Sequence, residues 1–347
     1  MRHNNLISPP PNPMESKNGQ LEAAATHSKD DFGCKYDLDT FHVEKVQRQF
    51  GFFRPHTARL KINQPEGGRV HWNSRGHRKG RHPEVEKGSG LKAPNRWYLT
   101  CTRRDLTNLS WWVGQIFIAG SIVWVVNGVY AVWPVLHTTS NTFSLQLAVT
   151  AMIGGTLFEI GGILLVIEAM SPEEKVELGY EMHVTSKGAD LTQQQRKRRH
   201  HWRVELGKQF RELGFLGSFL LLISATIYWI ACYTAVPSIL PATSSDTLMI
   251  WAYWFPQVLG GAGFVASSLC YMLEEQENWW LLAPRKLGWQ VGFWNLIGSL
   301  GFLLCGAFGI VEQAGVGNGW ATYQSPVSTL WGSIGFLIGE CYLVWIY

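Results

Sequence analysis

The sequence predicts an all-α membrane protein, with six transmembrane helices arranged as three parallel two-helix hairpin repeats and a largely disordered basic N-terminal region. Three observations support this prediction: six long apolar runs, an alternation of basic and non-basic connections, and a small-residue pattern that recurs three times. Residues 1–109 are polar and basic, and we assign them to a mostly disordered cytoplasmic region. Residues 110–347 form the predicted transmembrane domain.

Each of the six apolar runs is long enough to cross a bilayer. A hydrocarbon core of roughly 30 Å requires about 20 apolar residues in an α-helix. The first 20 residues carry prolines and charges instead, so they do not read as a secretory signal peptide. We place the helices at Ser110–Trp133, Leu145–Met170, Leu213–Ala235, Leu248–Leu273, Gly288–Val311 and Pro326–Tyr347.

The charges of the connections predict the orientation. Pro134–Ser144, Val236–Thr247 and Glu312–Ser325 contain no Lys or Arg, whereas the other connections are rich in them. Lys and Arg are retained on the cytoplasmic side during insertion. We therefore expect both termini in the cytoplasm, in a membrane whose organelle the sequence does not identify.

A recurring pattern of small residues predicts the repeat. In the second, fourth and sixth helices, a small pair precedes Phe158, Phe264 and Phe336, and further small residues follow seven positions after the pair. The first, third and fifth helices share Gly-Ser pairs at Gly120, Gly217 and Gly298. Such positions let helix backbones approach closely in lipid. The candidate helix-packing residues are Gly154, Gly155, Gly161, Gly162, Gly260, Gly261, Gly332 and Gly339.

The same alignment matches Ile346 with Glu168 and Glu274, so the chain stops where the sixth helix should reach the inner surface. We expect either a very short tail or a truncated chain.

Two carboxylates, Glu159 and Glu340, fall at similar predicted depth within the second and sixth helices. A charge at that depth is costly and usually faces a bundle interior or an aqueous path. One interpretation is a proton or cation relay, or a contact for a cationic substrate. The other is a neutral carboxyl that is hydrogen-bonded to a neighbouring helix.

Several other polar residues have ordinary structural interpretations. Asn127, Gln257 and Asn295 complete the candidate intramembrane polar site, although buried amides more often join helices. Pro256 predicts a kink or hinge in the fourth helix. At the cytoplasmic boundary, we expect hydrated carboxylates at Glu168, Glu274 and Glu275.

The N-terminal region offers a short strand at Ala58–Asn63 and a histidine-rich stretch. His71, His77 and His82 have basic neighbours that repel a cation, so no metal site is predicted. The basic tail and Arg196–His201 could contact anionic lipid, or reflect only the positive-inside rule. Nucleic-acid binding is a poor fit, because these basic segments lack an interleaved aromatic platform.

The sequence contains none of the enzyme motifs considered below. The apolar runs contain no histidine, which excludes bilayer haem ligation and a serine protease base. There is no H-E-x-x-H, P-loop or G-x-S-x-G motif. The six cysteines include no C-x-x-C pair, and four of them lie in apolar runs. We predict no catalytic residue, no cofactor and no metal.

A resemblance to known proteins rests on the third to fifth helices. The stretches Arg211–Leu216, Ser224–Trp229, Pro256–Phe264 and Leu287–Gly298 resemble a family of uncharacterised fungal multi-pass integral membrane proteins. The two-helix unit is more weakly similar to the YrhK-like membrane domain. Family members usually end the last helix with Trp-Tyr-Glu, whereas this chain ends Trp345-Ile346-Tyr347, which favours truncation. The resemblance implies a membrane location and no activity.

Two hypotheses for function follow. The first is a non-enzymatic membrane scaffold or organiser with the lipid bilayer as its main partner. The second is a small-solute or ion transporter or channel that uses Glu159 and Glu340. The few intramembrane charges favour the first slightly. The sequence leaves substrate, oligomeric state and homo-oligomer formation open.

Overall fold

The computed structural model describes the strands, one bridge residue and the helical bundle. These are residues 42–45, 53, 59–63, 69–73, 84–85, 109–137, 144–170, 209–241, 243–316 and 319–345. Most of residues 1–109, which were predicted to be largely disordered, lies outside these ranges. The basic run Arg196–His201 and the residues after Trp345 also lie outside them.

The N-terminal region contains a four-stranded antiparallel sheet in the order β1-β2-β3-β4. The strands are β1 (His42–Lys45), β2 (Arg59–Asn63), β3 (Arg69–Asn73) and β4 (Glu84–Val85). The strand predicted at Ala58–Asn63 corresponds to β2, and the other three were not predicted. β2 alternates charged and apolar residues with the period of a strand, whereas β1 and β4 are too short to give such a signal.

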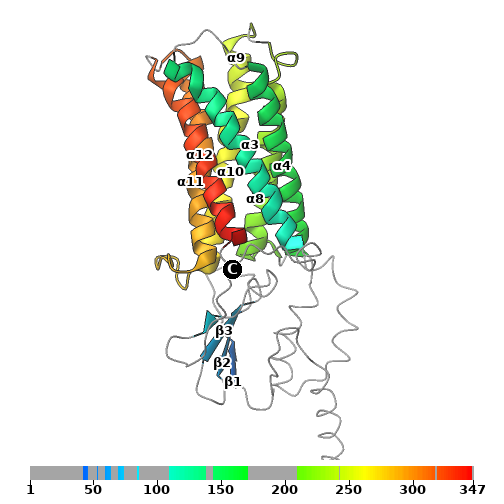
Figure 1. The fold of residues 1–347 in the computed structure, drawn as a ribbon, viewed down its shortest axis with the longest axis vertical. Coiled ribbons are helices and arrows are strands. Elements are labelled where there is room, and N and C mark those ends of the chain that lie inside the picture. The colour runs from blue at the N-terminus through cyan, green and yellow to red at the C-terminus, as the bar shows by residue number, and fades with distance from the viewer. Residues whose placement is uncertain are drawn as a thin grey trace, which may run out of the picture.

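The remaining described residues form a bundle of long helices (Figure 1). They are α3 (Leu109–His137), α4 (Ser144–Met170), α8 (Leu213–Thr234), α10 (Phe255–Glu275), α11 (Leu287–Gln313) and α12 (Trp320–Trp345). The short α9 (Asp246–Met249) and the π-helical turn η3 (Ile250–Trp254) lead directly into α10. We call the end of the bundle where α3 begins and α12 ends the inner end.

Five of these helical stretches are long and apolar enough to cross a membrane: α3, α4, α8, α9 through α10, and α11. The chain is therefore a multi-pass membrane protein by the length and composition of its helices. α12 is not among the five, and serine, threonine and glycine are interspersed along it. The helix begins at Trp320, so the prediction that it begins at Pro326 is wrong, and Pro326 lies inside the helix.

The six long helices form a closed ring. Each helix packs against the next one in the chain, and α12 returns to pack against α3 (Figure 1). The packing of α4 against α8 joins the first predicted hairpin to the second. Because the ring closes, every long helix has two neighbours, and residues at its centre can be shielded from lipid.

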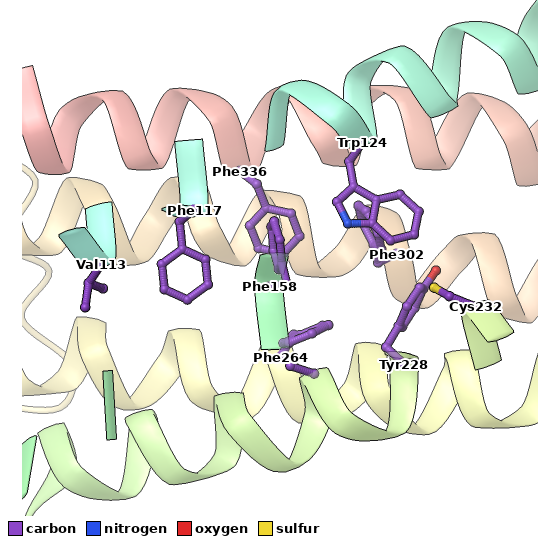
Figure 2. Packing of buried hydrophobic residues seen from close by; sticks show 10 residues of the cluster. Val113, Phe117, Trp124, Phe158, Tyr228, Cys232, Phe264, Phe302 and Phe336 are labelled. Atoms are coloured by element: carbon purple, nitrogen blue, oxygen red, sulfur yellow. The ribbon is translucent and has the colours of Figure 1, made fainter. Parts of the chain in front are cut away.

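Aromatic side chains from all six helices fill the centre of the ring (Figure 2). The ring centroids of Trp124 and Phe302 are 4.9 Å apart, and those of Phe158 and Phe336 are 5.5 Å apart, with edge-to-face geometry in both pairs. Tyr228 and Phe264 complete the layer, 6.2 Å from one another. Edge-to-face pairs bring the positive edge of one ring to the negative face of the next, which adds to the packing energy.

The backbones of α11 and α12 approach one another closely at Gly301. A methyl group in place of a hydrogen at Gly301 would lie 2.5 Å from Gly332 Cα and 2.6 Å from the Ser328 carbonyl oxygen. At Gly154 and Gly161 the space is filled by Trp124 and Phe117 of α3. The small residues thus accommodate either another backbone or an aromatic ring.

Pro256 is preceded by η3, so the predicted irregularity takes the form of a π-helical turn rather than a simple kink. Proline has no N–H to offer the Ala252 carbonyl four residues earlier. The hydroxyl of Thr234 in α8 is shared between that oxygen, at 3.1 Å, and the Ala231 carbonyl of its own helix, at 2.8 Å. The Phe255 N–H bonds the carbonyl of Ile250, five residues back. A side chain from a neighbouring helix thus satisfies the carbonyl that proline leaves open.

Candidate functional site

Glu159 lies near the middle of α4, at its contact with α8. Thr226 Oγ1 of α8 donates to Glu159 Oε1 at 2.9 Å and lies 3.2 Å from Oε2. One turn away, Trp229 Nε1 donates to Thr156 Oγ1 at 3.0 Å. We call these four residues the α4–α8 seam. The half-buried Glu159 carboxyl is therefore held by hydrogen bonding to the adjacent helix.

Glu340 occupies a different environment. Its side chain is only 6% exposed, and it lies one turn beyond Phe336 on the same face of α12. Phe336 reaches the aromatic centre, so Glu340 faces the bundle interior on the inner side of that centre.

Neither Glu159 nor Glu340 lines the small cavity that the structure describes beside the aromatic centre. The cavity is lined by residues of α3, α4, α8, α10 and α11. Its lining residues are Trp124, Gly155, Phe158, Ala225, Tyr228, Trp229, Phe264 and Phe302.

The three candidate amides are placed differently from one another. Asn127 Nδ2 donates across the first hairpin to the Leu147 carbonyl at 2.9 Å and to Thr150 Oγ1 at 2.8 Å. Gln257 Oε1 accepts from Tyr228 OH at 2.9 Å. The buried Oδ1 of Asn295 has no hydrogen-bond partner among the described residues, and it lies beside Gly339. Asn127 and Gln257 therefore join helices.

The carboxylates at the inner end are buried, which corrects the expectation that they are hydrated. Glu168, Glu274 and Glu275 are 6%, 1% and 9% exposed. Ser110 Oγ, in the first turn of α3, donates to Glu168 Oε1 at 2.7 Å. Glu275 lies against Gly288 in the first turn of α11. A helix N-terminus favours a nearby negative charge, which helps to stabilise Glu168 and Glu275 in these positions. The sequence alone did not show that α3 begins beside Glu168 or that α11 begins beside Glu275.

The connection between α10 and α11 exposes apolar side chains at the inner end. Trp279, Trp280, Leu281 and Leu282 are between 50% and 69% exposed. We call residues 279–282 the aromatic loop. Lys286 Nζ fixes its base by donating to the Glu275 carbonyl at 3.1 Å and lies 3.4 Å from Glu277 Oε1. Exposed tryptophans beside basic residues are typical of the headgroup level of a bilayer.

The residues that sequence reasoning missed are the partners of Glu159. Thr226, Thr156 and Trp229 carry no signal by themselves, because Thr and Trp are common in membrane helices. Their relation becomes visible only when α4 and α8 lie side by side. The available signal was spacing: Thr226 and Trp229 are three residues apart, as are Thr156 and Glu159.

The comparisons with known proteins give the site no further context. No protein-family model matches the chain, and neither the curated proteins nor the solved structures that were searched include a match. The resemblance to fungal membrane proteins stays a prediction.

Proposed function

We propose that this protein is a non-enzymatic organiser of the membrane that crosses the bilayer six times, with both termini in the cytoplasm. The sixth crossing is α12, whose packing against α3 and α11 supports a place in the membrane beside them. The loops without Lys or Arg then lie outside, and the inner end faces the cytoplasm.

The aromatic centre carries this proposal. Six helices contribute buried residues to one cluster, which occupies the axis that a channel would need to keep open. Ion pathways require polar groups or water along the pore. The described centre of the ring offers packed rings with Val113, Ala225 and Cys232 instead, and the hydroxyl of Tyr228 is taken up by its bond to Gln257.

The contact with lipid belongs to the same proposal. The aromatic loop would rest among the headgroups of the inner leaflet, and Arg285 beside it would favour anionic lipid. A protein of this kind acts by collecting particular lipids around itself, not by moving a solute or an ion across the membrane.

A flux experiment tests the proposal. Vesicles containing the purified protein should release Na⁺, K⁺ and H⁺ no faster than protein-free vesicles, because the aromatic centre seals the axis. Glu159→Gln and Glu340→Gln should behave like the original protein. If the original protein carries a flux of any of these ions and either variant abolishes that flux, the organiser proposal is wrong and the transporter hypothesis is favoured.

A lipid experiment supplies the positive half of the test. Fluorescent phosphatidylserine should be enriched around the reconstituted protein. The enrichment should fall when Trp279, Trp280 and Arg285 are all changed to serine. Trp251, exposed in η3 at the outer end of the bundle, gives the matched control, since Trp251→Ser removes an exposed tryptophan at the end of the bundle opposite the aromatic loop. Equal enrichment in all variants would contradict a role for the aromatic loop.

A further inference from the structure

Glu159 lies where the α4–α8 seam meets the outer surface of the bundle. Ile160 and Ile163 of α4 are 42% and 43% exposed, and Ile223 and Ile230 of α8 are 44% and 53% exposed. In a bilayer such isoleucines contact lipid. The half-buried carboxyl of Glu159 therefore lies at the edge of the lipid-facing surface.

No cationic side chain of the described long helices can balance a negative charge at Glu159. The segments 109–137, 144–170, 213–234, 246–275, 287–313 and 320–345 contain no Lys or Arg. An ionised carboxylate at this depth is costly unless a positive charge lies beside it. The other titratable residues of α4 and of the two helices packed against it are Tyr130, His137, Glu168, Tyr228, Cys232 and Tyr233, and none of them bonds Glu159.

The hydrogen count at Thr226 favours a proton on Glu159. Thr226 Oγ1 lies 2.9 Å from Glu159 Oε1 and 2.9 Å from the Leu222 carbonyl oxygen of its own helix. A threonine hydroxyl carries one hydrogen, so it can fill only one of these two contacts. If Glu159 is ionised, the other contact brings two oxygen atoms together with no hydrogen between them, which is repulsive. A protonated carboxyl removes this conflict, because it donates to Thr226 while Thr226 donates to Leu222.

The other polar side chains of the seam do not supply a second donor to Glu159. Trp229 Nε1 donates to Thr156 Oγ1 at 3.0 Å, and Thr156 Oγ1 donates to the Met152 carbonyl at 2.7 Å. Among the described residues, Thr226 is the one hydrogen-bond partner of Glu159. A carboxylate has two oxygens with several acceptor positions, and lipid cannot satisfy those that the protein leaves open. A neutral carboxyl is the form that fits one partner and a lipid neighbour.

We propose that Glu159 is a proton-binding site that is occupied at neutral pH and open to lipid. The bound proton forms the hydrogen bond to Thr226 Oγ1, so that bond is donated from α4 to α8. The site is independent of the organiser proposal, because holding a proton requires no passage across the membrane.

An acid group at the edge of the lipid is a target for a lipophilic carbodiimide. The acid proton moves to one carbodiimide nitrogen while the carboxyl oxygen bonds to the central carbon, which forms an O-acylisourea. Transfer of the acyl group to nitrogen then gives a stable N-acylurea. The adduct contains every atom of both reactants, and no group is oxidised or reduced.

Infrared difference spectroscopy of the full-length protein in lipid nanodiscs detects the proton directly. At neutral pH, the spectrum of the original protein minus that of Glu159→Gln should contain the carbonyl stretch of a protonated carboxyl and no carboxylate bands. Thr226→Val removes the acceptor, so this carbonyl stretch should move to higher frequency. Glu312→Gln is the matched control, because the exposed Glu312 at the outer end of α11 should contribute carboxylate bands. Carboxylate bands from Glu159 would overturn the proposal.

Carbodiimide labelling of the original protein gives a measurement that needs no variant. Dicyclohexylcarbodiimide, which dissolves in lipid, should leave an adduct on Glu159 at neutral pH, and peptide mass spectrometry locates it. Glu340, only 6% exposed and facing the bundle interior, should stay unlabelled. A water-soluble carbodiimide should label Glu159 far less. An unlabelled Glu159, or equal labelling of Glu159 by the two reagents, would contradict a proton that is open to lipid.

Discussion

At the scale of single residues, the glycines differ in what a methyl group would meet. A methyl at Gly301 would press on the backbone of α12, whereas one at Gly162 would make ordinary 3.4 Å contacts with Leu221 and Leu222. We expect Gly301→Ala to lower the free energy of unfolding by about 1–3 kcal/mol, because two backbones must separate. Thermal unfolding in detergent measures this.

Gly162→Ala is the matched control for that prediction. It makes the same substitution within a long helix of the same ring, and alanine's higher helix propensity offsets a small packing cost. We expect its unfolding temperature to lie close to that of the original protein. Equal losses in the two variants would mean that the close contact of α11 with α12 is not the cause.

At the scale of elements, the π-helical turn η3 depends on a bond from another helix. Thr234→Val removes the donor to the Ala252 carbonyl and should cost about 1 kcal/mol. Pro256→Ala restores a backbone N–H at the position from which a regular α-helix would reach the same oxygen. In the Pro256→Ala background, Thr234→Val should therefore cost clearly less.

The double-mutant cycle of these two substitutions measures their coupling through chemical or thermal unfolding. Additive losses would show that Thr234 and Pro256 act separately. Thr329→Val is a suitable control, because Thr329 Oγ1 bonds a carbonyl of its own helix and should show no coupling with Pro256.

At the scale of the whole molecule, the proposed topology places Thr138, Ser244 and Asn318 outside. In a cysteine-free background, single cysteines at these positions should react with a membrane-impermeant maleimide on intact cells. A cysteine at Asn278, beside the aromatic loop, should react only after the membrane is opened. If the three positions were labelled from different sides of the membrane, both the six-pass arrangement and the repeated hairpin would be wrong.

The sequence was informative wherever a feature repeats along one helix. The spacing around Phe158, Phe264 and Phe336 identified residues that share one helix face, and the three Phe side chains lie together in the aromatic centre. Apolar length identified the helices to within a few residues, except at α12. These features depend on local periodicity, which one sequence contains.

Features that depend on which helices are neighbours could not be predicted. The bond from Thr226 to Glu159 joins residues 67 positions apart, and the burial of Glu168 depends on where α3 begins. Glu159 and Glu340 looked equivalent by depth alone, yet one faces the seam and the other the interior. The two residues differ in the direction in which each side chain points from its helix axis, and the sequence predicts only their depth.

Closure of the ring by the last helix has a consequence for biosynthesis. Helices leave the ribosome in order, so α3 must wait for its second neighbour until the rest of the domain has been made. During that interval the surfaces around Gly128 and Gly301, which α12 later covers, face lipid or an assembly factor. Until α12 has been made, the six-helix ring stays open between α3 and α11, and its closure depends on α12.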